Sequence, residues 1–148
     1  MKLLKIAFAI CLAASAAISL LLFFSWNNYK TVPLPNFDAK PEFASIDKCS
    51  FNEKYLSVNG WAFDKNNPNA HAIVYAKKHS SDEWIIIKSS IENRPDVSNF
   101  FKANNMYDRA GFNASIRNIN YLGGLSGDIA VVINDDKGNA RGIRYECK

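Results

Sequence analysis

Few side chains in this sequence could catalyse a reaction. His71 and His79 are the only histidines, and both border a predicted strand near loops. Nucleophilic catalysis by Ser or Cys needs a histidine base close by, and no G-x-S-x-G elbow occurs. The sequence also lacks a phosphate-binding loop and a dinucleotide fingerprint. We therefore predict a protein that is not an enzyme and uses no cofactor.

A metal site is not expected either. The loop from Asp64 to Asn69, DKNNPN, has a partial likeness to a calcium-binding loop. However, Pro68 stands where a ligand is needed, Asn69 replaces the turn glycine, and Tyr75 replaces the bidentate glutamate. The sequence predicts a plain turn at this position.

Two cysteines are candidates for a disulfide. Cys49 alternates with Phe51, and Cys147 alternates with Ile143 and Tyr145, so both side chains could face inward from strands. Exported thiols in even number tend to pair. A zinc site is a poorer alternative, because neither cysteine has a close Cys or His partner. We predict a disulfide between Cys49 and Cys147 and an oxidising compartment.

Tryptophan side chains are candidates for ligand binding. Trp61 and Trp84, with several tyrosines, could provide a flat platform for sugar rings. A small domain also needs large side chains to fill its core, and aromatic residues bury the most area each. We favour core packing for both tryptophans and keep glycan binding as a hypothesis.

An apolar segment at the N-terminus is expected to hold the domain at a membrane. Ile6 to Trp26 contains no charged residue, and as a helix its length matches a bilayer core of roughly 30 Å. Lys2 and Lys5 precede it, and positive charge favours the cytoplasmic side. We predict a cytoplasmic stub (1–5), a single transmembrane anchor (6–26) in the cytoplasmic (inner) membrane, and a periplasmic or otherwise extracytoplasmic C-terminal domain.

Other uses of this segment stay open. It could be a cleaved signal peptide, although the small residues Ala13 to Ala17 are followed by more apolar chain. Lipid attachment at Cys11 is disfavoured, because Ile10 stands where such sites usually carry Gly or Ala. Ala9, Ala13 and Ala17 lie four residues apart, so a retained helix could self-associate along this face.

The remainder of the chain is predicted to be a linker followed by one domain. Residues 27–42 contain Pro33 and Pro35, with Pro41 near the end, which favours an extended spacer. The domain follows over residues 43–148.

Within the domain, the pattern is that of strands separated by turn residues. The predicted strands are Ala44–Phe51, Tyr55–Phe63, Ala72–Lys78, Trp84–Ser89, Phe112–Arg117, Asp128–Asn134 and Ala140–Cys147. Val97, Phe100 and Phe101 follow the spacing of one short helix over Pro95–Ala103. About seven strands and one helix predict a mainly β fold, a single β-sandwich.

The charge balance argues against a nucleic-acid partner. The chain has 18 basic and 14 acidic residues, and Lys2 and Lys5 lie on the far side of the predicted anchor. No basic run with interleaved aromatic residues occurs, so the surface lacks the footprint of a nucleic-acid-binding protein.

Three short motifs follow one another along the domain. They are Gly60-Trp61-Ala62, then Arg94-Pro95-Asp96-Val97 with Phe100-Phe101, then Ala110-Gly111-Phe112. The pattern resembles a small β module of bacterial cell-envelope proteins, sometimes appended to multi-spanning membrane glycosyltransferases of surface-polysaccharide pathways. The resemblance covers about Cys49 to Cys147. It implies a β-sandwich in the cell envelope and no catalytic residues.

The motif residues add two candidate ligand-binding side chains, Arg94 and Asp96. They flank Pro95 and could instead pair with each other or cap local backbone groups, and we favour these structural roles. Gly60 could allow close packing against a neighbouring backbone.

Together these features predict a non-enzymatic, membrane-anchored envelope protein whose exported β-sandwich binds a protein or glycan partner. The alternatives are an accessory subunit of a surface-polysaccharide-modifying membrane enzyme and a small exclusion or immunity factor.

Overall fold

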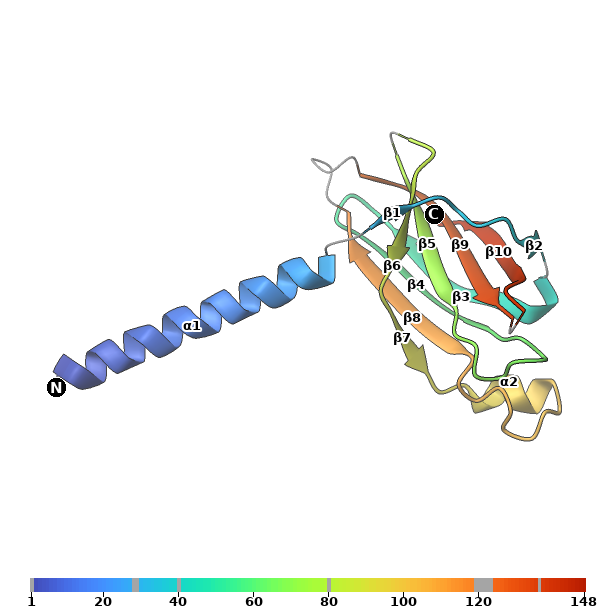
Figure 1. The fold of residues 1–148 in the computed structure, drawn as a ribbon, viewed down its shortest axis with the longest axis horizontal. Coiled ribbons are helices and arrows are strands. Elements are labelled where there is room, and N and C mark those ends of the chain that lie inside the picture. Colours follow the sequence, from blue (N-terminus) through green and yellow to red (C-terminus); the bar gives the residue numbers. More distant parts are fainter. Residues whose placement is uncertain (1, 28–29, 40, 80, 119–123, 136) are drawn as a thin grey trace.

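A long helix projects from a sandwich of two β-sheets (Figure 1). The computed structural model describes residues 2–27, 30–39, 41–79, 81–118, 124–135 and 137–148. The long helix is α1 (Lys2–Asn27), and a short helix, α2 (Pro95–Phe100), lies at the end of the sandwich away from α1. A 3-10 turn, η1 (Pro41–Phe43), leads into the first long strand. The predicted mainly β, sandwich-like fold is confirmed.

The two sheets differ in size. Sheet A contains, in spatial order, β1 (Thr31–Val32), β6 (Trp84–Ile87), β5 (Ile73–Lys78), β9 (Leu125–Asn134), β10 (Ala140–Glu146) and β2 (Asp38–Ala39). Sheet B contains β3 (Ala44–Phe51), β4 (Tyr55–Ala62), β8 (Gly111–Arg117) and β7 (Ser89–Glu92). Among the described strands, the pairs are antiparallel except for β10 with β2 at one edge of sheet A.

The main core lies between the sheets and follows the period of two that strands impose. In β4, Leu56 and Val58 point inward and are fully buried, while the side chains between them face outward. Ile129 and Val131 of β9 meet them from sheet A. This alternation explains why the long strands could be predicted from sequence.

Residues 31–39, which we call the strap, lie along the outer face of sheet A. Three strap side chains pack against four buried residues of the sheet: Val32, Leu34 and Phe37 against Tyr75, Trp84, Ala130 and Val132. Thr31–Val32 pairs with β6, and Asp38–Ala39 pairs with β10.

The strap corrects the expectation of a spacer over 27–42, of which residues 28, 29 and 40 lie outside the described residues. Sheet A is apolar on both faces, so its outer face needs a cover. The chain that arrives from α1 provides that cover instead of standing free as a linker.

The chain changes sheets at Lys88. The predicted strand Trp84–Ser89 therefore ends at Ile87, and Ser89 begins β7 in the other sheet, a strand that the sequence did not predict. Two consecutive strands with a one-residue connection look like one strand in the sequence, because the change of sheet has no local pattern.

The predicted helix over Pro95–Ala103 is also shorter, because α2 ends at Phe100. Lys102 has a φ of 51°, which a right-handed helix does not allow. The Ala103 amide instead donates to the Ser98 carbonyl (2.9 Å) and closes the helix end.

Helix α1 is long enough to cross a membrane. Leu4–Trp26 is the one segment of the described chain that is a helix of sufficient length and apolarity, and it is not buried against the sandwich. The hydroxyls of Ser15 and Ser19 donate to carbonyls of the preceding turn at 2.9 Å each, so they do not need water. Self-association through Ala9, Ala13 and Ala17, which are all exposed, stays a prediction.

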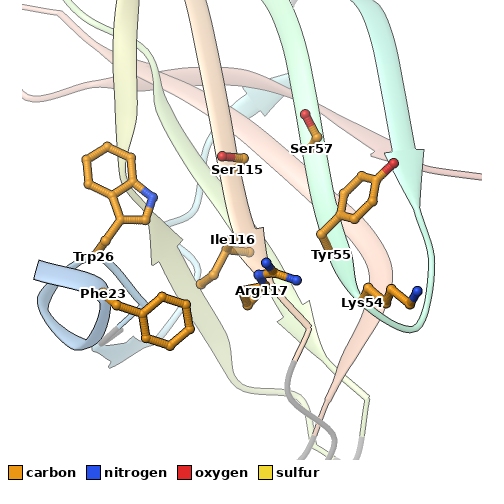
Figure 2. Close-up of a pocket in the computed structure, with 8 residues that line it drawn as sticks. All are labelled: Phe23, Trp26, Lys54, Tyr55, Ser57, Ser115, Ile116 and Arg117. Carbon is orange, nitrogen blue, oxygen red and sulfur yellow. The ribbon is translucent and has the colours of Figure 1, made fainter. Parts of the chain in front are cut away.

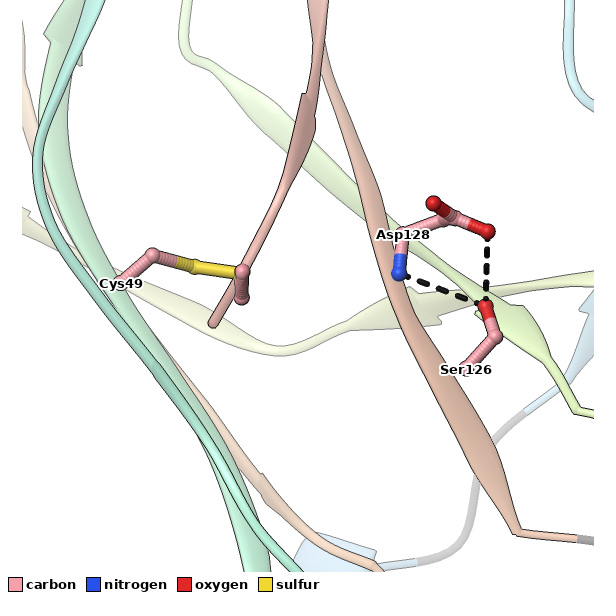
Figure 3. The surroundings of a disulfide bond; sticks show 4 residues. Cys49, Ser126 and Asp128 are labelled. Atoms are coloured by element: carbon pink, nitrogen blue, oxygen red, sulfur yellow. Dashed lines mark hydrogen bonds between the residues drawn. A yellow bond between two sulfur atoms is a disulfide. The ribbon is translucent and has the colours of Figure 1, made fainter.

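A disulfide joins the two sheets (Figure 3). Cys49 of β3 bonds to Cys147, which directly follows β10, with the Cα atoms 5.3 Å apart. The Cys147 amide donates to the Gly127 carbonyl (3.0 Å), and the nearby Ser126 hydroxyl donates to the Asp128 carboxylate (3.0 Å). The predicted pairing is confirmed, and Cys11 is free.

Replacing Cys49 and Cys147 together by Ser should destabilise the domain by up to about 4–5 kcal/mol, because the bond closes a loop of 98 residues in the unfolded chain. Urea denaturation of the oxidised protein and of the double variant measures this difference. Cys11→Ser is the control and should leave the midpoint unchanged. Equal midpoints for all three proteins would contradict a stabilising role of the bond.

Phe37→Ala should destabilise the domain by about 2 kcal/mol, because its ring covers the outer face of sheet A. Asn36→Ala, an exposed position of the same strap, should have almost no effect. Chemical denaturation of both variants makes the comparison. Equal stability of the two variants would show that the strap does not pack on the sheet in solution.

Candidate binding face of sheet B

The outer face of sheet B is polar and open. Every second side chain of its four antiparallel strands points away from the core. The outward side chains in the middle of the sheet form two rows, which together we call the polar face: Ser50, Ser57 and Ser115 in one row, and Lys48, Asn59, Asn113 and Ser90 in the other. None of these residues is buried. On sheet A, the strap covers the corresponding surface.

Two amide side chains lie at the centre of the polar face. Asn59 and Asn113 are directly opposed in β4 and β8. Within the part of the chain that the structure describes, neither side-chain amide makes a hydrogen bond. Each amide offers two donors and an acceptor oxygen. The pair can therefore bind a ligand without breaking an internal bond.

Trp61 lies at the end of the polar face that is near α2. Its ring stacks on Phe63 with 5.8 Å between the ring centres, and it meets Phe101 edge-on at 5.7 Å. Phe63 in turn stacks on Tyr107 with 3.9 Å between centres. This aromatic cluster holds the Trp61 ring in place while leaving it partly exposed. The favoured packing role of Trp61 is present, and its binding of a ligand stays a prediction.

Arg94 is paired with two carboxylates at this same end. Its Nε and Nη2 atoms donate to the Asp96 carboxylate at 2.9 and 2.7 Å, and Nη1 donates to Asp47. Asp47 reaches Arg94 from a bulge in β3, where an extra residue re-aims the side chain. Hydrogen bonding to Asp96 raises the pKa of Arg94, and hydrogen bonding from Arg94 lowers the pKa of Asp96. All three nitrogens are therefore engaged in structural contacts.

Two motif glycines permit close approaches around this cluster. A Cβ atom on Gly111 would lie 2.5 Å from Cγ of Arg94 and 2.6 Å from the Glu92 carbonyl oxygen. A Cβ atom on Gly60 would lie 2.2 Å from the Ser45 carbonyl oxygen, so the close packing expected at Gly60 is present. Gly111 therefore allows Arg94 to lie directly against β8, and Gly60 allows β3 to pack closely on β4.

A pocket lies at the opposite end of the polar face, beside α1 (Figure 2). Phe23 and Trp26 of α1 lie on one side of it, and Lys54 and Tyr55 lie on the other. The remaining lining comes from β4 and β8 and comprises Ser57, Ser115, Ile116 and Arg117. Ser57 and Ser115 belong to both the pocket and the polar face.

The structure does not bring all four predicted ligand residues together. Trp61, Arg94 and Asp96 lie at one end of sheet B. Trp84 belongs to the cluster under the strap on sheet A, where only 9% of its surface is exposed. The packing role favoured for Trp84 is therefore the one that the structure shows.

Other candidates from the sequence have simple structural positions. His71 and His79 are both exposed. Asp64 is 1% exposed, and its carboxylate accepts from the Asn66 amide at 2.7 Å and pairs with the Arg141 guanidinium at 2.7 Å. The loop is therefore a turn that these contacts hold in place. Among the described residues, no group of three or more His, Cys, Asp or Glu could hold a metal ion.

The residues that the sequence did not suggest are Asn59 and Asn113. A signal was present, since Asn59 alternates with the buried residues of β4, but only the register with β8 brings Asn113 beside it. Small polar residues on a strand give no indication of a site until their neighbours are known.

Asp96→Asn should lower the melting temperature at neutral pH and have no effect at strongly acidic pH. The folded-state pKa of Asp96 lies below the ordinary value of 3.8, so its stabilising effect is complete above that value and is lost as the pH falls through the folded pKa. Melting curves from pH 7 down to pH 2 measure the difference in melting temperature between the variant and the wild type. Asp38→Asn, an exposed carboxylate, is the control for the charge change. A difference in melting temperature that does not depend on pH would contradict the ion pair of Asp96 with Arg94.

Comparisons with protein-family models, with curated proteins and with solved structures found no match for this chain.

Proposed function

We propose that this chain is a non-enzymatic, membrane-anchored envelope protein whose exported β-sandwich binds a glycan on the polar face of sheet B. In this proposal α1 spans the cytoplasmic membrane with its N-terminus inside, and the sandwich lies in the extracytoplasmic space. The apolar length of Leu4–Trp26 and the Cys49–Cys147 disulfide support this arrangement.

The observation that carries the proposal is the difference between the two outer faces. The strap covers sheet A, whereas sheet B leaves two rows of small hydroxyl and amide side chains open. Solvated faces of sheets commonly carry charged residues, but Lys48 is the one charged side chain among the seven residues of the polar face. Such a surface suits a neutral ligand with many hydroxyl groups.

The geometry of the polar face suits an extended sugar chain. From Tyr55 to Trp61 the β4 strand covers about 20 Å. Asn59 and Asn113 can donate to and accept from sugar hydroxyls at its centre. The partly exposed ring of Trp61 offers an apolar surface to the C–H face of a sugar at one end.

A second candidate function is the accessory subunit of a polysaccharide-modifying membrane enzyme. The observation that favours it is the apolar surface around α2, where 79% of Phe100 and 51% of Met106 are exposed. Side chains of this kind are enriched in protein interfaces. In that arrangement the sandwich contacts another protein beside the end of the polar face.

Replacing Asn59 and Asn113 together by Ala should weaken glycan binding roughly tenfold, because two hydrogen-bonding side chains are lost. The full-length protein in detergent is first applied to an array of bacterial surface oligosaccharides. The strongest ligand is then titrated by calorimetry.

The matched control is Asn69→Ala with Asn99→Ala, two exposed amides outside the polar face, which should keep the wild-type affinity. Absence of binding to every oligosaccharide, or equal affinities for the two double variants, would reject the glycan proposal. Recovery of a glycosyltransferase from membranes by the wild type but not by Phe100→Ser would favour the second candidate.

A further inference from the structure

The pocket beside α1 lies where a membrane surface would meet the sandwich. The end of α1 contacts the sandwich directly: the Lys88 ammonium donates to the Ser25 carbonyl and lies 5.8 Å from the centre of the Trp26 ring. A cation is favourable at that position, because carbonyls at a helix C-terminus carry partial negative charge. Trp26 suits the interface between hydrocarbon and water. In the anchored topology proposed above, the pocket therefore opens at the depth of the lipid headgroups.

The lining combines cationic, hydroxyl and aromatic side chains. Lys54 and Arg117 provide two positive charges, and no Asp or Glu is among the described lining residues. Ser57 and Ser115 add hydroxyls, and Phe23 and Trp26 add apolar rings toward the membrane. The volume is about 650 Å³, which is in the range of small-molecule sites.

The backbone that carries Lys54 is held in place. The Lys54 amide donates to Oδ1 of Asn52 at 2.8 Å, and the Asn118 amide donates to the Lys54 carbonyl at 3.0 Å. These bonds fix the turn after β3 against the end of β8. Lys54 and Arg117 are thus presented together on the same side of the sheet.

We propose that this pocket binds the phosphate of an anionic lipid headgroup in the outer leaflet of the membrane that α1 spans. Lys54 and Arg117 contact the phosphate oxygens, Ser57 and Ser115 donate to the remaining headgroup oxygens, and Phe23 and Trp26 lie against the upper acyl chains. Charge-assisted bonds of this kind are about twice as strong as neutral ones. The site orients the sandwich on the membrane and rests on the anchored topology proposed above.

The apolar wall favours a lipid over a dissolved phosphate ester. Phe23 and Trp26 come from the helix that crosses the membrane, so this side of the pocket continues into the bilayer. A small soluble phosphate would leave the exposed surfaces of these two side chains, 45% of Phe23 and 50% of Trp26, in water. The lipid chain covers them, which adds apolar burial to the charge contacts.

The test uses the full-length protein extracted in a neutral detergent and native mass spectrometry with added lipid. Phosphatidylglycerol should remain bound roughly tenfold more than phosphatidylcholine. Lys54→Gln with Arg117→Gln should lose this preference. Lys65→Gln with Lys137→Gln removes the same charge at the opposite end of β4 and should keep it.

Two further measurements distinguish binding in the pocket from attraction to surface charge, and binding of a lipid from binding of a free phosphate. Ser115→Phe fills the pocket while both cations stay, and it should lose the preference as well. Glycerol 3-phosphate at millimolar concentration should not displace the lipid. Equal retention of both lipids, an unchanged preference in either pocket variant, or displacement by glycerol 3-phosphate would overturn the proposal.

The lipid proposal and the glycan proposal can be rejected independently of each other. Asn59→Ala with Asn113→Ala should keep the lipid preference, and Lys54→Gln with Arg117→Gln should keep the glycan affinity. The intact mass of the extracted protein reports whether α1 is retained, so loss of the anchor is distinguished from failure of the pocket.

Discussion

The architecture depends on the need to cover sheet A on both faces. Its inner face packs on sheet B, and its outer face carries Tyr75, Trp84, Ala130 and Val132, which water would solvate poorly. The strap, which follows α1 in the chain, covers this outer face. As a result, the sandwich begins only a few residues after the end of α1, and the outer face of sheet B is left uncovered. The different exposure of the two outer faces is therefore a consequence of one packing requirement.

Much of the fold could be predicted from the sequence because the strands are rich in apolar residues, are bounded by turn residues and, in β4 and β8, alternate clearly. The bounds of β3 were correct, and those of β4 were correct to within one residue, since Leu56, Val58 and Ala62 mark the inner face. The strap could not be predicted, because its prolines favour an extended chain whether it is free or bound. A signal did exist in Ala130–Val132, an uninterrupted apolar run that is typical of a strand buried on both faces.

The candidate site was harder to predict than the fold. Tryptophan and arginine attract attention in a sequence, yet the packing around Trp84 and the ion pairs of Arg94 engage both side chains internally. The residues that are open to a ligand are small and polar, and they come from strands 54 positions apart in the chain, as Asn59 and Asn113 illustrate. Only the register of β4 with β8 makes them neighbours. The pocket beside α1 likewise requires the position of the helix, which no local pattern encodes.

The strap also makes the connection between α1 and the sandwich extensible. Fifteen residues lie between Asn27 and Phe43, and when fully stretched this segment spans roughly 55 Å. If a tensile load separates β1 from β6, β2 from β10 and Lys88 from the end of α1, the sandwich moves away from α1 on this segment. The load then meets β3, and the Cys49–Cys147 bond passes it to both sheets at once. Burial of the apolar face of sheet A favours the return of the strap to its packed position.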